Sequence, residues 1–289
     1  MQIATNGLKL EVDVRGAGEP LVLIMGIGTQ LVHWQPDFCD GLVARGFQVI
    51  RFDNRDIGRS AWLDHLGTPD LKWMLAKVAI GMKVKAPYRL SDMALDVVGL
   101  LDSLGLKKAH LLGISMGGMI AQTVAIEHPH RVSSLVSFNS TTGDREFIGK
   151  PSTIGALFSK QPQTREEIGD FALHIWRTLG TARYPPDEVD VRRIALEAYD
   201  RGVHPQGFMR QFAAILASGS RRRLLRDVTA RTLVIHGSDD PLIPMAAGRA
   251  TADAVPGARF HVIDGLGHVF NRAAWPELTE AITRHAGLA

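Results

Sequence analysis

Short runs of apolar residues alternate, through the first half of the chain, with segments in which apolar positions recur every three or four residues. A continuous apolar run is typical of a strand buried on both faces, and the wider spacing is typical of a helix with one buried face. Strands are predicted at 21–25, 47–52, 109–112 and 132–138, and helices at 34–44, 93–104 and 119–126. This alternation predicts a mostly parallel sheet with helices on both faces.

The first residues follow a different pattern, in which apolar and polar positions alternate on either side of Asn6-Gly7. That dipeptide favours the two-residue type I′ turn of a β-hairpin. The next helix boundaries are also marked by local chemistry. Ser91 or Asp92 is expected to cap the helix over 93–104, and Gly105 is expected to end it.

Helical spacing dominates from residue 143 to residue 227, where no convincing strand interrupts it. The helices predicted there lie at 165–179, 187–199 and 205–217. Strands resume at 232–235 and 258–263, and Pro276 opens a last helix. We therefore expect a core domain made of residues 1–142 and 228–289, with residues 143–227 inserted as a helical cap over the sheet.

A candidate nucleophile lies where the strand at 109–112 gives way to the following helix. The sequence there reads Gly113-x-Ser115-x-Gly117, the nucleophile-elbow pattern. A sharp turn from strand to helix brings the backbone so close on both sides that only glycine fits two residues before and two residues after the serine. The turn would hold the Ser115 hydroxyl above the sheet at a helix N-terminus, where backbone N–H groups can stabilise negative charge.

Two later strands end in loops that carry titratable groups. The strand at 232–235 runs into residues 236–244, and the strand at 258–263 runs into a loop that ends at His268. The carboxyl ends of parallel strands meet at one edge of a sheet, the edge that presents Ser115. Because a serine hydroxyl needs an adjacent base that is itself oriented by an acid, both loops are candidates to complete the site.

The order and spacing of these motifs make the chain resemble the α/β-hydrolases over essentially its whole length. Gly237-x-x-Asp240-x-x-x-Pro244 is similar to the acid loop of that family, and Gly267-His268 is similar to its histidine loop. The resemblance implies the α/β-hydrolase fold, with Ser115 as nucleophile, His268 as base and Asp240, rather than Asp239, as acid. Residues 23–28 with Trp34, and residues 49–60, resemble the esterase subgroup that includes anthracycline (aclacinomycin) methylesterases.

The same resemblance implies an oxyanion hole formed by the N–H groups of Ile27 and Met116. Gly26 and Gly28 would let the backbone approach the substrate, and Trp34 is expected beside them as a further substrate contact. The family usually has a histidine where this chain has Met25. The loop therefore lacks the polar group that normally braces it.

Several other polar residues are assigned structural roles. Asp53 and Arg55 are expected to tie their loop by charge-assisted hydrogen bonds, and His236 is expected to be buried and hydrogen-bonded. His128 and His130 have no cysteine or carboxylate neighbours, so a zinc site is not expected there. No other metal site and no organic cofactor is expected.

Composition narrows the class of protein. The 289 residues are 45% hydrophobic with a net charge of +3, which gives no reason to expect a nucleic-acid surface. Arg221-Arg222-Arg223 is interpreted as a solvated helix face. A single cysteine, Cys39, excludes an intramolecular disulfide. Neither a signal peptide nor an apolar run of membrane-spanning length is apparent, so a cytoplasmic monomer or homodimer is expected.

The segment 71–82 is apolar with interspersed lysines. It is expected either to pack under the cap or to form an apolar wall at the mouth of the pocket, with Trp73 as a specificity residue.

Three functions are compatible with these patterns. The first is hydrolysis of a small to medium, lipophilic carboxylic ester through an acyl-enzyme. The second is hydrolysis of a carbon–carbon bond in a diketone-like ring-fission product, which the same Ser-His-Asp triad can serve. The third is non-catalytic ligand binding on the same fold.

Overall fold

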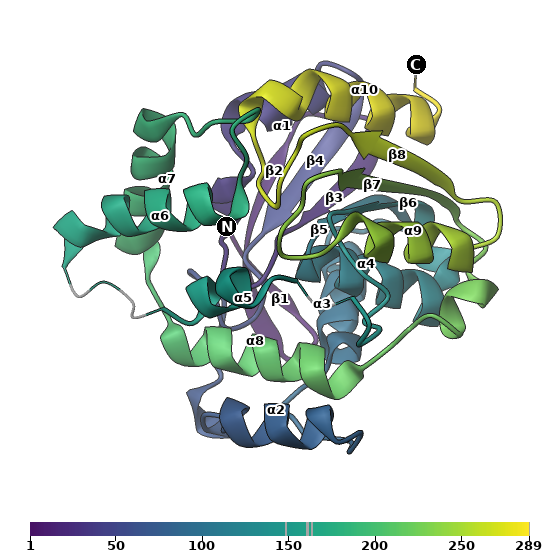
Figure 1. Ribbon diagram of the computed structural model, residues 1–289. Coiled ribbons are helices and arrows are strands. Elements are labelled where there is room, and N and C mark those ends of the chain that lie inside the picture. Colours follow the sequence, from purple (N-terminus) through teal and green to yellow (C-terminus); the bar gives the residue numbers. More distant parts are fainter. Residues whose placement is uncertain (148, 160–161, 163, 289) are drawn as a thin grey trace.

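The computed structural model describes residues 1–147, 149–159, 162 and 164–288. Its strands form one sheet in the order β1-β2-β4-β3-β5-β6-β7-β8 (Figure 1). Only β2 is antiparallel to its neighbours, and the other adjacent pairs are parallel. The mostly parallel sheet predicted from the sequence is therefore confirmed. The strands are β1 (Gln2–Thr5), β2 (Leu8–Arg15), β3 (Glu19–Ile24), β4 (Phe47–Phe52), β5 (Ala109–Ile114), β6 (Val132–Phe138), β7 (Arg231–Gly237) and β8 (Arg259–Ile263).

The hairpin between β1 and β2 has the predicted turn. Asn6 and Gly7 have φ values of 46° and 75°, both in the left-handed region that a type I′ turn requires. Thr5 pairs directly with Leu8 across the turn. The local sequence therefore fixes the register of this antiparallel pair.

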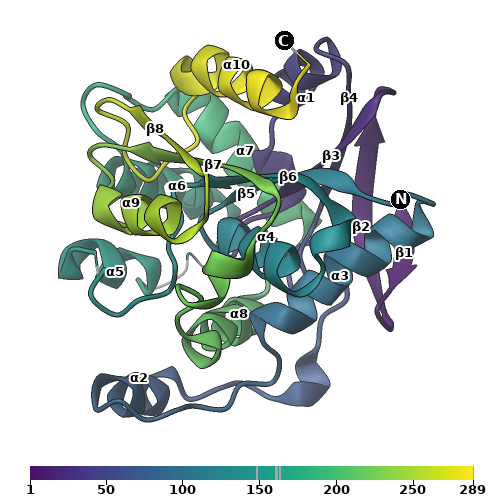
Figure 2. The same ribbon diagram turned by 90° about the vertical axis from the view of Figure 1, so that its right-hand side faces the viewer.

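Helices cover both faces of the sheet, as predicted (Figure 2). One apolar cluster joins the sheet to α1 (Pro36–Val43) and α10 (Trp275–Ala286), and a second joins it to α3, α4 and α9. These three helices are α3 (Leu90–Ser103), α4 (Met116–Glu127) and α9 (Met245–Ala254). The central strands β3 and β5 are buried on both sides, which explains their continuous apolar sequences.

Some helix boundaries differ from the predicted ones. The helix expected at 34–44 begins only at Pro36, after a 3₁₀ turn over Leu31–His33. The predicted cap at Ser91 or Asp92 is wrong, because Arg89 is the capping residue and Asp92 lies inside the first turn. There the Asp92 carboxylate accepts a hydrogen bond from the Arg89 N–H at 2.7 Å. The other 3₁₀ turns are Asp64–Leu66, Pro129–Arg131, Leu224–Asp227 and Arg272–Ala274.

The helices of the insertion lie over the edge of the sheet where the parallel strands end. They are α5 (Pro151–Leu157), α6 (Arg165–Leu179), α7 (Glu188–Arg201) and α8 (Pro205–Ser218). Another helix, α2 (Leu71–Ala79), packs against α8 from outside. The chain enters and leaves the insertion through adjacent segments, since the Arg221 N–H donates to the Thr142 carbonyl at 2.8 Å. Leu225 already belongs to the core cluster, although it falls within the range 143–227 assigned to the cap.

Arg221 does not lie on a solvated helix face, which corrects the interpretation of the basic run. Its side chain is buried where the insertion rejoins the core, and it donates to the Thr141 carbonyl at 2.9 Å and to Gln122 Oε1 at 3.2 Å. Burial lowers the pKa of this guanidinium to about 10. Arg222 and Arg223, by contrast, are exposed.

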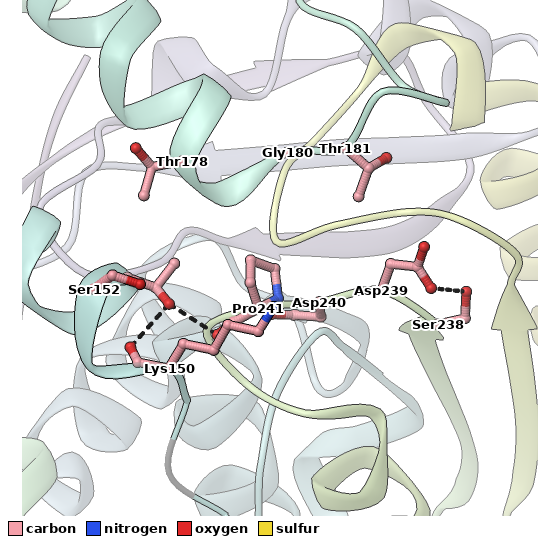
Figure 3. Close-up of a pocket in the computed structure, with 10 residues that line it drawn as sticks. Lys150, Ser152, Thr178, Gly180, Thr181, Ser238, Asp239, Asp240 and Pro241 are labelled. Carbon is pink, nitrogen blue, oxygen red and sulfur yellow. Dashed lines mark hydrogen bonds between the residues drawn. The ribbon is translucent and has the colours of Figure 1, made fainter.

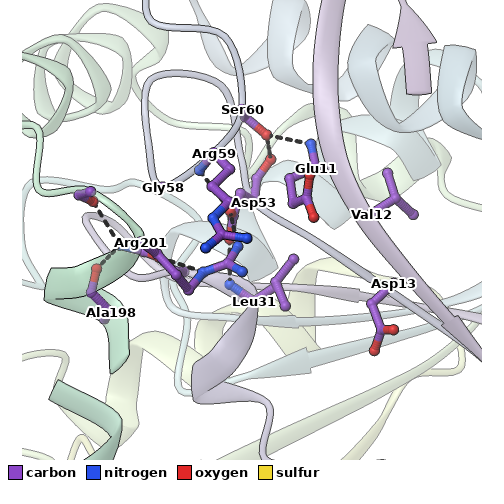
Figure 4. Close-up of polar contacts among 12 residues, drawn as sticks. Glu11, Val12, Asp13, Leu31, Asp53, Gly58, Arg59, Ser60, Ala198 and Arg201 are labelled. Carbon is purple, nitrogen blue, oxygen red and sulfur yellow. Dashed lines mark hydrogen bonds and ion pairs between the residues drawn. The ribbon is translucent and has the colours of Figure 1, made fainter. Parts of the chain in front are cut away.

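Two buried ion pairs attach the cap to the loop that follows β4. Asp53, with a fully buried side chain, pairs with Arg201 at the end of α7 and also accepts the N–H groups of Leu31 and Arg59 (Figure 4). Asp56 accepts two hydrogen bonds, at 2.7 and 2.9 Å, from Arg210 on α8. The expected structural role of Asp53 is confirmed, and the inserted helices are attached to the core through two carboxylates whose side chains are fully buried.

We predict that Arg210→Ala lowers the free energy of unfolding by about 3–5 kcal/mol, because it leaves the Asp56 carboxylate buried without its cation. Urea denaturation followed by circular dichroism measures this loss. Arg165→Ala is the matched control, since its ion pair with Asp200 is about half exposed on both sides. The control should lose less than about 1 kcal/mol, and equal losses in the two variants would contradict the prediction.

Candidate active site

Ser115 lies at the turn between β5 and α4 in a strained backbone conformation, with φ 55° and ψ −121°. The two flanking glycines permit this turn. A Cβ at Gly113 would collide with the carbonyl of Gly117, and a Cβ at Gly117 would collide with the carbonyl of Ile24. A positive φ in a residue other than glycine costs of the order of 1–3 kcal/mol, and such strain is concentrated at functional sites.

The structure brings Ser115, His268 and Asp240 together although they come from three separate loops. Ser115 Oγ lies 3.1 Å from His268 Nε2, and His268 Nδ1 lies 2.6 Å from Asp240 Oδ2. The Asp240 side chain is fully buried, and that of His268 is nearly so. When Nδ1 carries the ring proton and donates a hydrogen bond to the Asp240 carboxylate, Nε2 has a free lone pair that can accept the serine proton.

The acid loop holds Asp240 through its backbone. Asp240 Oδ1 accepts the N–H groups of Leu242 and Ile243 at 2.9 and 2.8 Å, while Asp239 is exposed and bonds to the Ser238 hydroxyl. His236 is fully buried and hydrogen-bonded to the Ile243 carbonyl at 2.9 Å, as the sequence predicted. Burial lowers the pKa of the His236 imidazole, so this ring stays neutral beside the acid.

Asn139, which the sequence analysis missed, links the two loops. It lies immediately after β6, fully buried, with φ 43°. Its side chain accepts the Gly237 N–H at 2.9 Å and donates to the Gly267 carbonyl at 3.0 Å. One amide therefore joins the start of the acid loop to the start of the histidine loop.

The loop after β3 lies directly against the nucleophile. A Cβ at Gly26 would lie 3.3 Å from Ser115 Cβ, so the backbone itself forms the wall of the site here. Within the described part of the chain, no acceptor is found for the N–H groups of Ile27 and Met116. Two unpaired N–H groups beside a serine hydroxyl can bind the oxygen of a substrate carbonyl as it becomes negative.

Three side chains brace this loop where the family histidine is replaced by Met25. Asn54 donates to the Met25 carbonyl at 3.0 Å, and the Thr29 hydroxyl donates to the Gly26 carbonyl at 2.9 Å. Gln211, from α8 of the cap, accepts the Gly28 N–H at 2.9 Å and is fully buried. Gln211 is 183 residues from Gly28 in the chain, so no local sequence pattern could have indicated this contact.

Trp34 was expected to contact the substrate, but the structure places it away from the site. Its indole is fully buried in the core cluster under the sheet, stacked on Phe38 with ring centroids 5.8 Å apart and in edge contact with Phe270 at 4.8 Å. The residue packs α1 and the C-terminal segment together and has no face left for a substrate.

Aromatic residues of the cap lie over the oxyanion loop instead. Phe208 of α8 sits so close to Gly28 that a Cβ there would approach its ring to 2.7 Å. Phe158 packs edge-on against Phe208 and Phe212, with ring centroids 5.8 and 4.9 Å apart. Phenylalanine rings from the inserted helices therefore cover the loop at Gly28.

A separate cavity of about 650 Å³ opens between the cap and the outer side of the acid loop (Figure 3). Its lining is mostly polar and includes Asp240 but neither Ser115 nor His268. The residues that surround it are Lys150, Ser152, Thr153, Thr178, Gly180, Thr181, Ser238, Asp239, Asp240 and Pro241. Because the cavity contacts Asp240 but neither Ser115 nor His268, we do not assign it to the part of a substrate that reacts.

Metal ligation is not suggested by the residues that the structure describes. Among them, no group of three histidine, cysteine or acidic side chains could hold an ion. His128 and His130 have ring centroids 6.5 Å apart and lie at the end of α4, away from Ser115. None of the described helices is long and apolar enough to cross a membrane.

Comparison with known proteins shows the family of the chain. A family model for the alpha/beta hydrolase fold matches residues 19–271, and the chain therefore belongs to the α/β-hydrolase fold family. Among curated proteins, rhodomycin D methylesterase DnrP of Streptomyces peucetius is 29% identical over an alignment of 294 positions. The alignment covers 94% of this chain and 92% of the relative. The similarity to this relative supports hydrolase activity for the chain.

Two solved structures resemble the fold at a TM-score of 0.74. One is the enol-lactonase from Burkholderia xenovorans LB400, at 23% identity and covering 99% of this chain and 100% of that one. The other is the meta-cleavage product hydrolase CumD from Pseudomonas fluorescens IP01, at 19% identity and covering 99% and 97%. At these identities the likeness concerns the fold alone.

Proposed function

We propose that this protein is a serine carboxylic-ester hydrolase that acts on a small to medium, lipophilic ester through an acyl-enzyme. The observation that carries the proposal is the hydrogen-bonded series from Ser115 to His268 to Asp240, which lies beside two unpaired backbone N–H groups. The methylesterase relative supports an ester as the substrate, and the phenylalanine rings over Gly28 support a lipophilic one.

In the proposed reaction, Ser115 Oγ attacks the ester carbonyl carbon while its proton passes to His268 Nε2. The carbonyl oxygen becomes negative and binds the N–H groups of Ile27 and Met116. Asp240 holds the imidazolium in place, and His268 then gives its proton to the departing alcohol. A water molecule, deprotonated by His268, then attacks the acyl carbon. The bond to Ser115 Oγ breaks, His268 returns the proton to that oxygen, and the acid is released.

Turnover of p-nitrophenyl esters from acetate to octanoate tests this proposal, together with labelling by a fluorophosphonate. We expect hydrolysis, and we expect mass spectrometry to locate a single phosphonyl group on Ser115. Hydrolysis of a diketone-like ring-fission substrate, without hydrolysis of any ester, would replace the proposal with carbon–carbon bond cleavage. Binding of either substrate class without turnover would indicate a non-catalytic ligand-binding protein.

Gln211 should contribute to rate without contacting the substrate. We predict that Gln211→Leu lowers kcat for ester hydrolysis about tenfold and leaves KM nearly unchanged, because it removes a hydrogen bond worth about 1–1.5 kcal/mol that holds the oxyanion loop. Steady-state kinetics measures both constants. Gln211→Glu keeps the acceptor for the Gly28 N–H but loses the N–H that Gln211 donates to the Arg55 carbonyl at 2.8 Å, so it should recover only part of the loss. An unchanged kcat in Gln211→Leu would show that the loop keeps its shape without the cap.

A further inference from the structure

The outer face of α2 carries large apolar side chains that no part of the described chain covers. Leu71, Met74 and Val78 form one side of the helix and pack against α8. The remaining positions point away, and Trp73 and Ile80 are 61% and 73% exposed. Leu75 and Met82 are exposed as well. The segment 71–82 thus packs on the outer side of α8 and not under the cap, which corrects the first expectation, and the exposed Trp73 does not form a wall of the pocket.

The helix lies at the periphery of the molecule, on the far side of α8 from the sheet, in both views (Figures 1 and 2). A helix that is apolar on both its inner and outer faces is ordinarily covered on both. Clustered exposed apolar side chains on a monomer commonly mark a surface that binds another body.

All charged side chains from residue 71 to residue 91 are positive, and the exposed Asp70, which caps α2, immediately precedes them. Between residues 71 and 91 there is no aspartate or glutamate. The cations are interleaved with the apolar side chains, and the Lys77 ammonium lies 4.9 Å from the centre of the Trp73 ring. The basic residues of this stretch are Lys72, Lys77, Lys83, Lys85 and Arg89.

We infer that this surface, formed by α2 and residues 80–85, docks on an anionic phospholipid membrane. Apolar side chains interleaved with lysines on an outward helix face match the interfacial region of a bilayer, where the apolar groups enter the acyl boundary and the ammonium groups meet the lipid phosphates. An aromatic ring with a polar edge, such as Trp73, is favoured at that depth.

A single helix, α8, connects the docking surface to the candidate active site. α8 packs against α2 through Ala213 and Met209, and the same helix places Phe208 over Gly28. A docked molecule would therefore hold α8, which carries Phe208, close to the interface where lipophilic compounds concentrate. The inference concerns binding alone, so its test does not depend on the proposed hydrolysis.

Co-sedimentation with vesicles tests the inference. The full chain should bind phosphatidylglycerol vesicles, bind phosphatidylcholine vesicles much more weakly, and dissociate as salt is raised. The tryptophan fluorescence of the chain should shift to the blue on binding, and Trp73→Phe, which keeps the other four tryptophans, should not show this shift. Each lysine near an anionic surface contributes about fivefold to partitioning, so Lys72→Glu/Lys83→Glu/Lys85→Glu should weaken binding at least about 100-fold.

Matched variants separate this surface from the rest of the molecule. Lys107→Glu/Lys108→Glu reverses two exposed lysines elsewhere and should bind vesicles like the parent. Trp73→Ser/Ile80→Ser should lose binding, whereas Val189→Ser, which alters an exposed apolar residue of α7, should not.

Three outcomes would overturn the inference. They are no binding to phosphatidylglycerol at low salt, equal binding by the α2 variants and their controls, and light scattering that shows a dimer which Ile80→Ser converts to a monomer. The last result would assign the surface to a second copy of the chain. Unchanged circular dichroism of each variant establishes that it has folded.

Discussion

Replacing Ser115 by alanine is expected to lower kcat for ester hydrolysis about 10⁵- to 10⁶-fold while KM changes little. The substitution removes the only atom that can form the acyl-enzyme in the proposed mechanism. The surrounding donors at Ile27 and Met116 remain, so a small residual rate above that of water is expected from oxyanion stabilisation and binding.

The Ser115→Ala measurement needs a control for the loss of a hydrogen-bonded serine hydroxyl. Ser134→Ala serves, since Ser134 lies near the start of β6 and hydrogen-bonds to His110 at 2.7 Å, at the opposite end of the sheet from the site. It should lose about 1 kcal/mol of stability and almost no activity. If Ser115→Ala kept more than about a hundredth of the parent activity, the serine mechanism would be wrong.

Replacing Asp240 by asparagine is expected to lower kcat about 10⁴-fold. The amide is close to the carboxylate in shape, but its NH₂ group cannot accept the His268 Nδ1–H. The ring then turns to the other tautomer, in which Nε2 carries the proton and cannot take one from Ser115. The backbone donors of Leu242 and Ile243 can still bond to the amide oxygen, so the loop should keep its conformation.

Asp239→Asn is the matched control, because the two aspartates are adjacent and only Asp240 touches His268. Its activity should stay within about twofold of the parent, as expected for a surface substitution away from the reacting atoms. Steady-state kinetics of both variants decides between the two acids. A large loss in Asp239→Asn with an active Asp240→Asn would contradict the assignment.

Much of the core could be predicted because its signals are local. The elbow around Ser115 is recognisable within five residues, although the close neighbour that requires Gly117 is the distant Ile24 carbonyl. The type I′ turn at Asn6-Gly7 depends on the positive φ of two residues. The buried strands can be recognised in the sequence because a strand covered on both faces has to be apolar throughout. The helix α9 went unpredicted for the converse reason, since its alanine- and glycine-rich sequence has no strong apolar spacing.

The residues that were misjudged depend on distant neighbours. Arg221 is part of a basic run that would be solvated on an isolated helix, yet the junction between cap and core surrounds it with carbonyl groups. Trp34 follows the glycine loop in sequence, yet its indole turns into the core against Phe38 and Phe270. Burial of one side chain by another segment leaves no trace in the sequence near either one.

The sequence by itself determined the α/β architecture and the elbow at Ser115, because strand periodicity and tight turns are properties of a few consecutive residues. Asp240 and His268 were implied by the resemblance of their loops to those of the α/β-hydrolases. The tertiary structure alone decided how the site is braced. Asn139 joins two loops, Gln211 reaches the oxyanion loop from the cap, and Arg210 fastens that cap through Asp56. These contacts span from about one hundred to nearly two hundred residues, and the free energy that selects them comes from burying polar groups together once the chain has folded.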